Sequence, residues 1–240
     1  MTDDELAALV RRADPDRFLG AMFAPAPQRR DLLILYAFNH ELARAREVAS
    51  TAPLTLIRLH WWREVVEGAM REHPIARLLR DALDRNAFAP ADLIALINAR
   101  EAEAEPIADL PAFMAYVRGT SGGLAVLAGG VLGVIDDIEP TTFESIGTGY
   151  AIARILATAK SLSQYGRDLL PQDGTDPTAL ARTATVLVSP RLPRAAMPIA
   201  TLAILARRDL SRLSRGRPSD ARGIGDRLAV LSGAFIRALG

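Results

Sequence analysis

Proline punctuates this chain in a way that constrains its fold more than any other feature. Long stretches rich in Ala and Leu show little of the β-branched alternation that is typical of strands, and several begin at or near a proline. Proline suits the first turn of a helix because the N–H that it lacks would have no partner there. The pattern predicts an all-α protein. The expected helices span residues 3–13, 15–23, 27–50, 53–70, 74–86, 90–105, 110–132, 140–165, 176–188, 194–213 and 220–239.

The chain has the size and composition of one folded domain. Its 240 residues are 50% hydrophobic and 24% charged, which is enough to bury a substantial core. The segment 170–178 is the only plausible internal boundary, and we interpret it as a loop, so the predicted domain is 1–240. The longest apolar run, 124–135, has 12 residues and is too short to cross a bilayer, so we expect it in the core. No cysteine is present, which excludes disulfides and thiolate metal sites.

One apolar stripe can be followed along the expected helix 53–70. Five apolar residues recur at three- and four-residue steps: Leu56, Leu59, Trp62, Val66 and Ala69. This spacing predicts that they share a buried helix face.

Charge is distributed unevenly although the chain carries only +1 overall. The segment 181–240 holds eleven arginines and three aspartates, a net charge of +8, so the first 180 residues carry about −7. The basic segment could face an anionic partner. Alternatively, 28 of the 29 basic residues are Arg, which is also the composition that a GC-rich genome produces on solvated helix surfaces.

Four short motifs follow one another in an order that resembles the squalene and phytoene synthases. They are YAFNH at 36–40, WRE at 62–64, YVRGTSGG at 116–123 and GRDLLP at 166–171. The resemblance covers roughly residues 16–171, about two-thirds of the chain. It implies a single-domain, isoprenoid-synthase-like helical bundle around a central cavity.

The resemblance also identifies what this chain lacks. Active members of the family carry an Asp-Asp-x-x-Asp motif on one helix, and the matching positions here are Ala43, Arg44 and Glu47. A second acidic motif precedes GRDLLP in the family, but no acid lies between Glu144 and Asp168 in this chain. Magnesium ions that grip a diphosphate need several hard oxygen ligands. We therefore expect no cofactor and no metal site, and no catalytic residue is assigned.

The cavity expected from the resemblance has ten candidate lining residues. Arg44 has a planar fork that suits an oxyanion without a metal, or it pairs with Glu47 in an ordinary helix-surface ion pair. Lys160 is a candidate phosphate ligand, or a solvated surface lysine. His40 has no second His or acid pair nearby, which argues against a metal ligand. The candidates are Tyr36, Asn39, His40, Arg44, Glu47, Trp62, Tyr116, Thr120, Arg154 and Lys160.

A divergent branch of the family matches these departures better than the synthases do. The segments FNHELARAREV and IRLHWWREVVEG resemble a mitochondrial complex I assembly factor that is related to squalene and phytoene synthases. This resemblance implies a non-catalytic protein that serves as an assembly or lipid-binding factor, with an isoprenoid or lipid ligand and a respiratory-complex subunit as partners. The alternative is an active prenyltransferase that condenses two prenyl diphosphates and uses Mg²⁺, with Arg44, Arg154 and Lys160 replacing part of the metal charge.

The basic segment 181–240 supports a third interpretation, contact with an anionic membrane surface. Aromatic residues make up only 5% of the chain and do not alternate with the arginines, so we expect no nucleic-acid partner. The chain begins MTDDE, which is acidic where a targeting peptide is basic. We therefore expect a cytoplasmic protein that contacts the inner face of a membrane peripherally.

Overall fold

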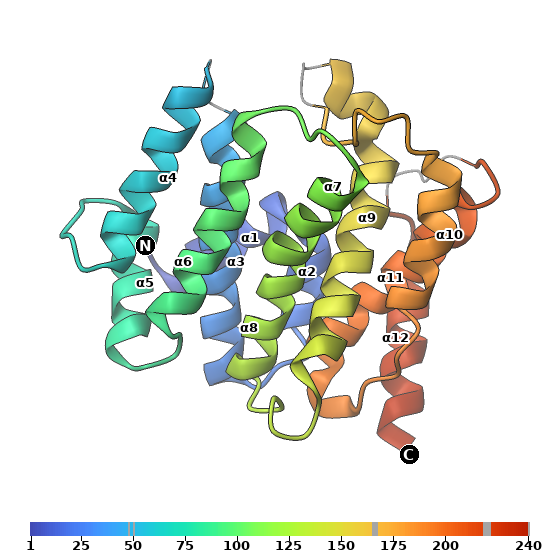
Figure 1. Cartoon of the computed structure of the whole chain (residues 1–240). Helices are drawn as coiled ribbons and strands as arrows, with labels where there is room; N and C mark the ends of the chain where they lie inside the picture. The colour runs from blue at the N-terminus through green and yellow to red at the C-terminus, as the bar shows by residue number, and fades with distance from the viewer. Residues whose placement is uncertain (48, 50, 165–167, 218–221, 240) are drawn as a thin grey trace.

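The computed structural model describes every residue except 48, 50, 165–167, 218–221 and 240, and Figure 1 shows a bundle of helices. The described part of the chain contains no strand, which confirms the all-α fold. In chain order the elements are α1 (Asp3–Ala13), α2 (Pro15–Ala21), α3 (Ala26–Glu47), α4 (Ala52–Val66), α5 (Pro74–Asp84), α6 (Pro90–Arg100), η1 (Glu101–Ala104), α7 (Leu110–Val117), η2 (Arg118–Gly122), α8 (Gly123–Val131), α9 (Pro140–Gln164), α10 (Pro177–Leu187), η3 (Arg194–Ala196), α11 (Met197–Leu213) and α12 (Ile224–Leu239).

The N-terminal helices begin at residues that satisfy their first backbone N–H groups. Thr2 accepts a hydrogen bond from the Glu5 N–H, and the Glu5 carboxylate accepts one from the Thr2 N–H, which is a complete capping box. Only Asp14 separates α1 from α2, and its carboxylate accepts the Arg17 N–H at 3.0 Å while Pro15 occupies the first turn. This one-residue connection fixes the position of residues 14–17 relative to α1 and α2.

Two long helices form the centre of the bundle. α3 packs against α1, α4 and α5, and α9 packs against α8, α10 and α11, so the two divide the fold into two flanks (Figure 1). Gly147 of α9 lets the helix approach η2 closely, because a β-carbon there would collide with the carbonyl oxygen of Ser121. This close approach positions η2, a π-helical turn, beside α9.

The predicted helices follow the order of the helices in the described residues, but eleven were expected and the structure has twelve α-helices there; otherwise they differ mainly at their ends. The expected helix 110–132 is α7 and α8 with the π-helical turn η2 inserted between them. A wider turn of this kind is common at functional sites. The expected start at residue 220 lies outside the described residues, and α12 begins at Ile224. Residues 222 and 223 are not helical.

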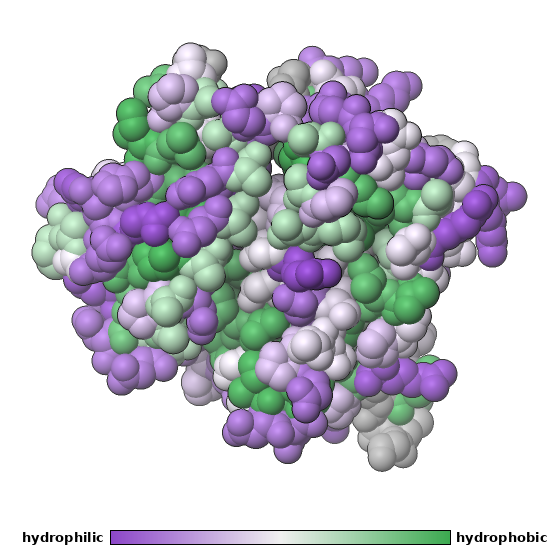
Figure 2. Space-filling model, viewed as in Figure 1, coloured by the Kyte–Doolittle hydropathy of each residue, from purple (hydrophilic) through white to green (hydrophobic). Residues whose placement is uncertain are grey.

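The predicted stripe on α4 needs one correction. Leu59, Trp62 and Val66 are buried, but Leu56 is 43% exposed and Thr55 is buried instead. Ala69 is half-buried and lies beyond the end of α4. Positions 55, 59, 62 and 66 recur at steps of four, three and four, which is the regular spacing of one face, and Leu56 lies one residue off it. The hydrophobic surface over the upper end of α4, at the upper left of Figure 2, agrees with the exposure of Leu54, Leu56 and Ile57.

The apolar run 124–135 lies largely in the core, as its length predicts. Among the described helices, none is both long enough and apolar enough to span a membrane.

Candidate ligand cavity

A cavity of about 340 Å³ lies between α1, α2, α3, α6, α7, η2 and α9. Polar and charged side chains line much of it, and apolar residues from α9 and the loop that follows complete the wall. The lining comprises Ala13, Asp14, Pro15, Asp16, Arg17, Ala43, Glu47, Arg100, Tyr116, Thr120, Ser121, Tyr150, Ala151, Arg154, Ile155, Thr158, Leu162, Leu169 and Arg222.

Arg17 of α2 is fixed in the wall by partners on three elements. Its guanidinium donates to the Asp14 carboxylate and to the Ser121 hydroxyl, both at 2.7 Å, and lies 4.9 Å from the ring centroid of Tyr150. Burial disfavours the charged form, but the charge and hydrogen bond of Asp14 outweigh it, so the pKa of Arg17 is raised above its ordinary value. Arg17 is a permanent, buried and already paired cation.

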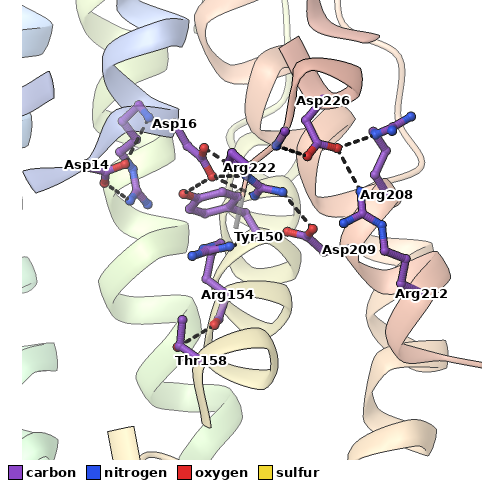
Figure 3. A network of polar contacts seen from close by, with 12 residues as sticks. Asp14, Asp16, Tyr150, Arg154, Thr158, Arg208, Asp209, Arg212, Arg222 and Asp226 are labelled. Atoms are coloured by element: carbon purple, nitrogen blue, oxygen red, sulfur yellow. Dashed lines mark hydrogen bonds and ion pairs between the residues drawn. The ribbon is translucent and has the colours of Figure 1, made fainter. Parts of the chain in front are cut away.

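Arg222 joins α2 to α11 through two buried aspartates, as Figure 3 shows. It donates to both oxygens of Asp16, at 2.7 and 3.0 Å, and to Oδ1 of Asp209 at 2.7 Å. Burial opposes its charge, but the hydrogen bond and charge of Asp16 and the charge of Asp209 raise the pKa of Arg222. Asp16 lies in α2 and Arg222 lies just before α12, so this ion pair connects the N-terminal and C-terminal parts of the chain.

Tyr150 and Arg154 of α9 extend the same network. The Tyr150 hydroxyl donates to Oδ2 of Asp16 at 3.1 Å, and the Arg154 guanidinium lies 3.8 Å from Oδ2 of Asp209. Burial raises the pKa of Tyr150 well above its ordinary value, and the charges of Asp14 and Asp16 add to this rise. Tyr150 therefore stays protonated and acts as a donor.

A second paired arginine, Arg100 at the end of α6, closes the opposite side of the cavity. It forms an ion pair with Glu103 and donates to Oδ1 of Asn39 at 3.0 Å. The Tyr116 hydroxyl donates to Glu103 at 2.6 Å. Burial disfavours the charge on Arg100, but the Glu103 carboxylate outweighs this effect and raises the pKa of Arg100.

The wall between α3 and α9 is where the family resemblance places metal-binding acids. α3 contributes Ala43 and Glu47, and α9 contributes Arg154 and Thr158. The Thr158 hydroxyl donates to the carbonyl oxygen of Arg154 at 2.8 Å, within its own helix. Glu47 is thus the one carboxylate among these four residues.

The residues of this cavity do not fit a magnesium cluster. Within the described residues, no three Asp, Glu or His side chains come together as a group that could hold an ion. The two lining aspartates, Asp14 and Asp16, are engaged by Arg17 and Arg222. A divalent ion would have to compete with arginines that already neutralise them, and Mg²⁺ needs near-octahedral oxygen ligands.

The structure places the ten predicted cavity residues in several locations. Glu47, Tyr116, Thr120 and Arg154 line this cavity. Asn39 and Tyr36 do not line the cavity but contact residues that do. Asn39 accepts a hydrogen bond from Arg100, and the Tyr36 ring centroid lies 6.0 Å from the Arg17 guanidinium.

The remaining four predicted residues lie away from this cavity's lining. Arg44 and Trp62 line a separate pocket near His73, and Arg44 donates to Glu41 at 3.1 Å. Lys160 is exposed on α9, and His40 is half-buried on α3. A ligand role for any of the ten residues remains a prediction.

Sequence reasoning singled out Arg154 but not the other charged residues of the network: Asp14, Asp16, Arg17 and Arg222. The local sequence predicts Asp14 as a helix cap and Asp16 and Arg17 as residues of the first helical turn, and the structure places them in these positions. Arg222 is one of eleven arginines in its segment and has no distinguishing local pattern. The segment DPDR at 14–17 is the signal that could have indicated these residues, because two acids and a base lie together there at an expected helix start.

The fold is that of the isoprenoid-forming synthases. A dehydrosqualene synthase solved in complex with ligand superposes with a TM-score of 0.79 at 12% identity, over 98% of this chain and 96% of that one. Squalene synthase HpnC from Alicyclobacillus acidocaldarius superposes with a TM-score of 0.70 at 17% identity, over 90% and 95% of the two chains. These identities are low, so the likeness defines the fold alone.

The squalene/phytoene synthase family model matches residues 10–233, so the chain belongs to that family. Among curated proteins, "NADH dehydrogenase (ubiquinone) complex I, assembly factor 6" of Rattus norvegicus is 28% identical over 171 residues, covering 69% of this chain and 51% of the relative. The Homo sapiens protein of that name is 25% identical over 178 residues, covering 72% and 54%. This chain spans about half the length of the curated relatives that it matches.

Proposed function

We propose that this chain is a non-catalytic member of the squalene/phytoene synthase family that acts as an assembly or lipid-binding factor for a respiratory complex. The observation that carries the proposal is the pairing of the cavity's aspartates with arginines. Asp14 and Asp16 are each held by a guanidinium at 2.7 Å, as charge-assisted hydrogen bonds.

Electrostatics support the loss of catalysis. Departure of a diphosphate requires an excess of positive charge, which bound metal ions supply in this chemistry. Arg17, Arg100 and Arg222 are each compensated by a carboxylate. Arg154 lies 3.8 Å from Asp209, which Arg222 also engages. The described lining residues therefore offer no group of free carboxylates for a metal cluster, and most of the lining arginines are already paired.

A lipid ligand remains compatible with the cavity. Its volume of about 340 Å³ lies in the range of small-molecule sites, and Ile155, Leu162 and Leu169 provide an apolar side. Such a surface binds a hydrocarbon chain without a metal. We propose that the ligand is an isoprenoid or another lipid whose chain contacts this side.

The assembly role comes from the relatives. The curated proteins that this chain resembles are named as complex I assembly factors, and the match covers about half their length. We propose a subunit of the respiratory complex as the protein partner. We further propose that the chain works from the cytoplasm at the inner face of the membrane, since the segment 181–240 carries a net charge of +8.

Turnover assays test the absence of catalysis. The purified full chain is incubated with farnesyl or geranylgeranyl diphosphate and Mg²⁺, and diphosphate release is measured. We expect no release above a protein-free control. Magnesium-dependent release that Glu47→Gln abolishes would establish the prenyltransferase alternative.

Complementation tests the assembly role. The host gene is deleted, and complex I is measured on native gels and by NADH oxidation in membranes. We expect less assembled complex, full rescue by the wild type and equal rescue by Glu47→Gln, because the proposal gives that carboxylate no catalytic part. Unchanged complex I in the deletion strain would remove the assembly role.

A further inference from the structure

The C-terminal helix α12 has two opposite faces of different character. Asp226 and Val230 lie on its buried face, with 3% and 0% of their surface exposed. On a helix of 3.6 residues per turn, positions 224, 228, 231 and 235 form a narrow stripe directly opposite. Four large apolar side chains occupy this stripe, each more than half exposed: Ile224, Leu228, Leu231 and Phe235.

Strong polar anchors fix the orientation of α12. The Asp226 carboxylate accepts hydrogen bonds from Arg208 at 2.6 Å, from Arg212 at 2.9 Å and from the Gly223 N–H at 3.1 Å (Figure 3). Burial of Val230 adds an apolar contact on the same side. The helix lies at the outer edge of the bundle, at the lower right of Figure 1. Its apolar stripe is therefore held outward by the fold.

Basic side chains flank the stripe. A groove of about 260 Å³ runs between α12 and the helices α1 and α2, and its lining includes Arg11 and Arg227. Both arginines are exposed. Apolar side chains also line this groove: Phe18, Leu19 and Leu205. An exposed apolar stripe beside exposed arginines is the pattern of a helix that lies in the plane of a membrane surface.

We propose that α12 is the membrane-contacting element of this protein, with the stripe Ile224, Leu228, Leu231 and Phe235 in the acyl region of an anionic lipid surface. Arg11 and Arg227 contact the lipid phosphates from the flank. The assignment rests on the proposed membrane contact and names the surface that makes it. Charge complementarity selects an anionic lipid surface over a neutral protein groove, because the exposed arginines Arg11 and Arg227 line the groove beside α12.

A single introduced cysteine can report on the stripe directly, because the chain has no cysteine of its own. Leu231→Cys carries a polarity-sensitive fluorophore, and Ile57→Cys, on the exposed apolar face of α4, is the matched control with 62% exposure. Vesicles of phosphatidylcholine mixed with phosphatidylglycerol are then added. We expect a blue shift of the emission at position 231 and none at 57. A shift at 57 alone would overturn the assignment.

Flotation separates failure of this assignment from failure of the proposed membrane contact. The wild type should float with vesicles that contain phosphatidylglycerol and far less with phosphatidylcholine alone. We expect Leu228→Ser/Leu231→Ser to lower the bound fraction at least about tenfold, and Arg11→Gln/Arg227→Gln to lower it several-fold. The matched controls, Leu54→Ser/Ile57→Ser on α4 and Arg182→Gln on α10, should bind as the wild type does.

Each other result has a distinct meaning. A floating wild type whose α12 variants float equally well leaves the membrane contact standing and overturns the role of α12. A wild type that does not float overturns both. Gel filtration of the same proteins without vesicles tests whether a second copy of the chain covers the stripe instead of lipid. A wild-type dimer that the α12 variants dissociate would assign the stripe to that second copy.

Discussion

The two walls of the cavity use charge in opposite ways. The wall built from α2, η2 and Arg222 has two aspartates and two arginines joined in largely buried ion pairs. The wall between α3 and α9, where the family resemblance expects two acidic motifs, has Glu47 as its carboxylate among Ala43, Arg154 and Thr158. In the first wall each aspartate is paired with an arginine, whereas the wall between α3 and α9 has almost no acidic side chains.

The difference shows that acids near a cavity need not serve a ligand. A buried carboxylate that accepts several guanidinium hydrogen bonds is satisfied, and breaking such a pair leaves an uncompensated charge. Asp16 is in this state, because Arg222 and Tyr150 both donate to it. The paired wall therefore supports the fold, and substitutions there should act on stability first.

The largest effect is expected for Arg222→Ala. Removing this guanidinium leaves Asp16 and Asp209 buried beside each other, and loss of one partner of a buried pair typically costs about 3–5 kcal/mol. Urea unfolding followed by circular dichroism measures the change. Arg215→Ala changes an exposed arginine in the turn that follows α11; it is the control and should change stability by less than about 0.5 kcal/mol. If the two substitutions had equal effects, the ion pairs of Arg222 with Asp16 and Asp209 would contribute nothing to the free energy of unfolding.

A second prediction concerns the anchor of α12 and its pH dependence. Burial opposes ionisation of Asp226, but the Arg208 hydrogen bond, the Gly223 N–H and the Arg212 charge hold its pKa below the ordinary value of 3.8. The stabilisation is therefore complete above pH 3.8 and decreases as the pH falls below that value. Asp226→Asn should cost about 2 kcal/mol at neutral pH. The variant should also lose less stability than the wild type on acidification, as thermal unfolding at several pH values will show.

Tyr116→Phe should have a smaller effect at the far side of the cavity. The substitution removes the hydroxyl that donates to Glu103 at 2.6 Å, while Arg100 still pairs with that carboxylate. We expect a loss of about 1 kcal/mol. A double-mutant cycle with Glu103→Gln isolates the pairwise energy. Full additivity of the two changes would show that the hydroxyl acts elsewhere.

The smallest effect is expected on the wall between α3 and α9, where Glu47 is the carboxylate among Ala43, Arg154 and Thr158. Glu47 is exposed, so Glu47→Gln should change the free energy of unfolding by less than about 0.5 kcal/mol. The same urea titration measures it. A cost comparable to that of Arg222→Ala would erase the contrast between the two walls.

Local sequence patterns predict the helices of this fold well because their information lies within a few residues. Prolines at the starts of α5, α6 and α10 fix those boundaries. The π-helical turn η2 was missed, since it depends on contact between Ser121 and Gly147, which are far apart in the sequence. Leu56 was misplaced because a three-residue step to Leu59 fits a buried face as well as the true four-residue step from Thr55.

The candidate site was only partly predictable for the same reason. Glu47, Tyr116, Thr120 and Arg154 line the cavity. The first three lie in segments that resemble the family's motifs, and Arg154 lies in the stretch where the family's second acidic motif is expected. Arg222 could not be found in this way, because its partner Asp16 is 206 positions earlier in the chain. An arginine that pairs across such a separation looks like any solvated arginine until the chain is folded.

Metal binding tests the central claim most directly. Mn²⁺, which is paramagnetic and can stand in for Mg²⁺, is titrated into the full chain in the presence of inorganic pyrophosphate, and bound ion is followed by electron paramagnetic resonance. We predict the same free-ion signal as in a protein-free pyrophosphate titration. Saturable binding of more than one ion per chain, abolished by Glu47→Gln, would contradict the account.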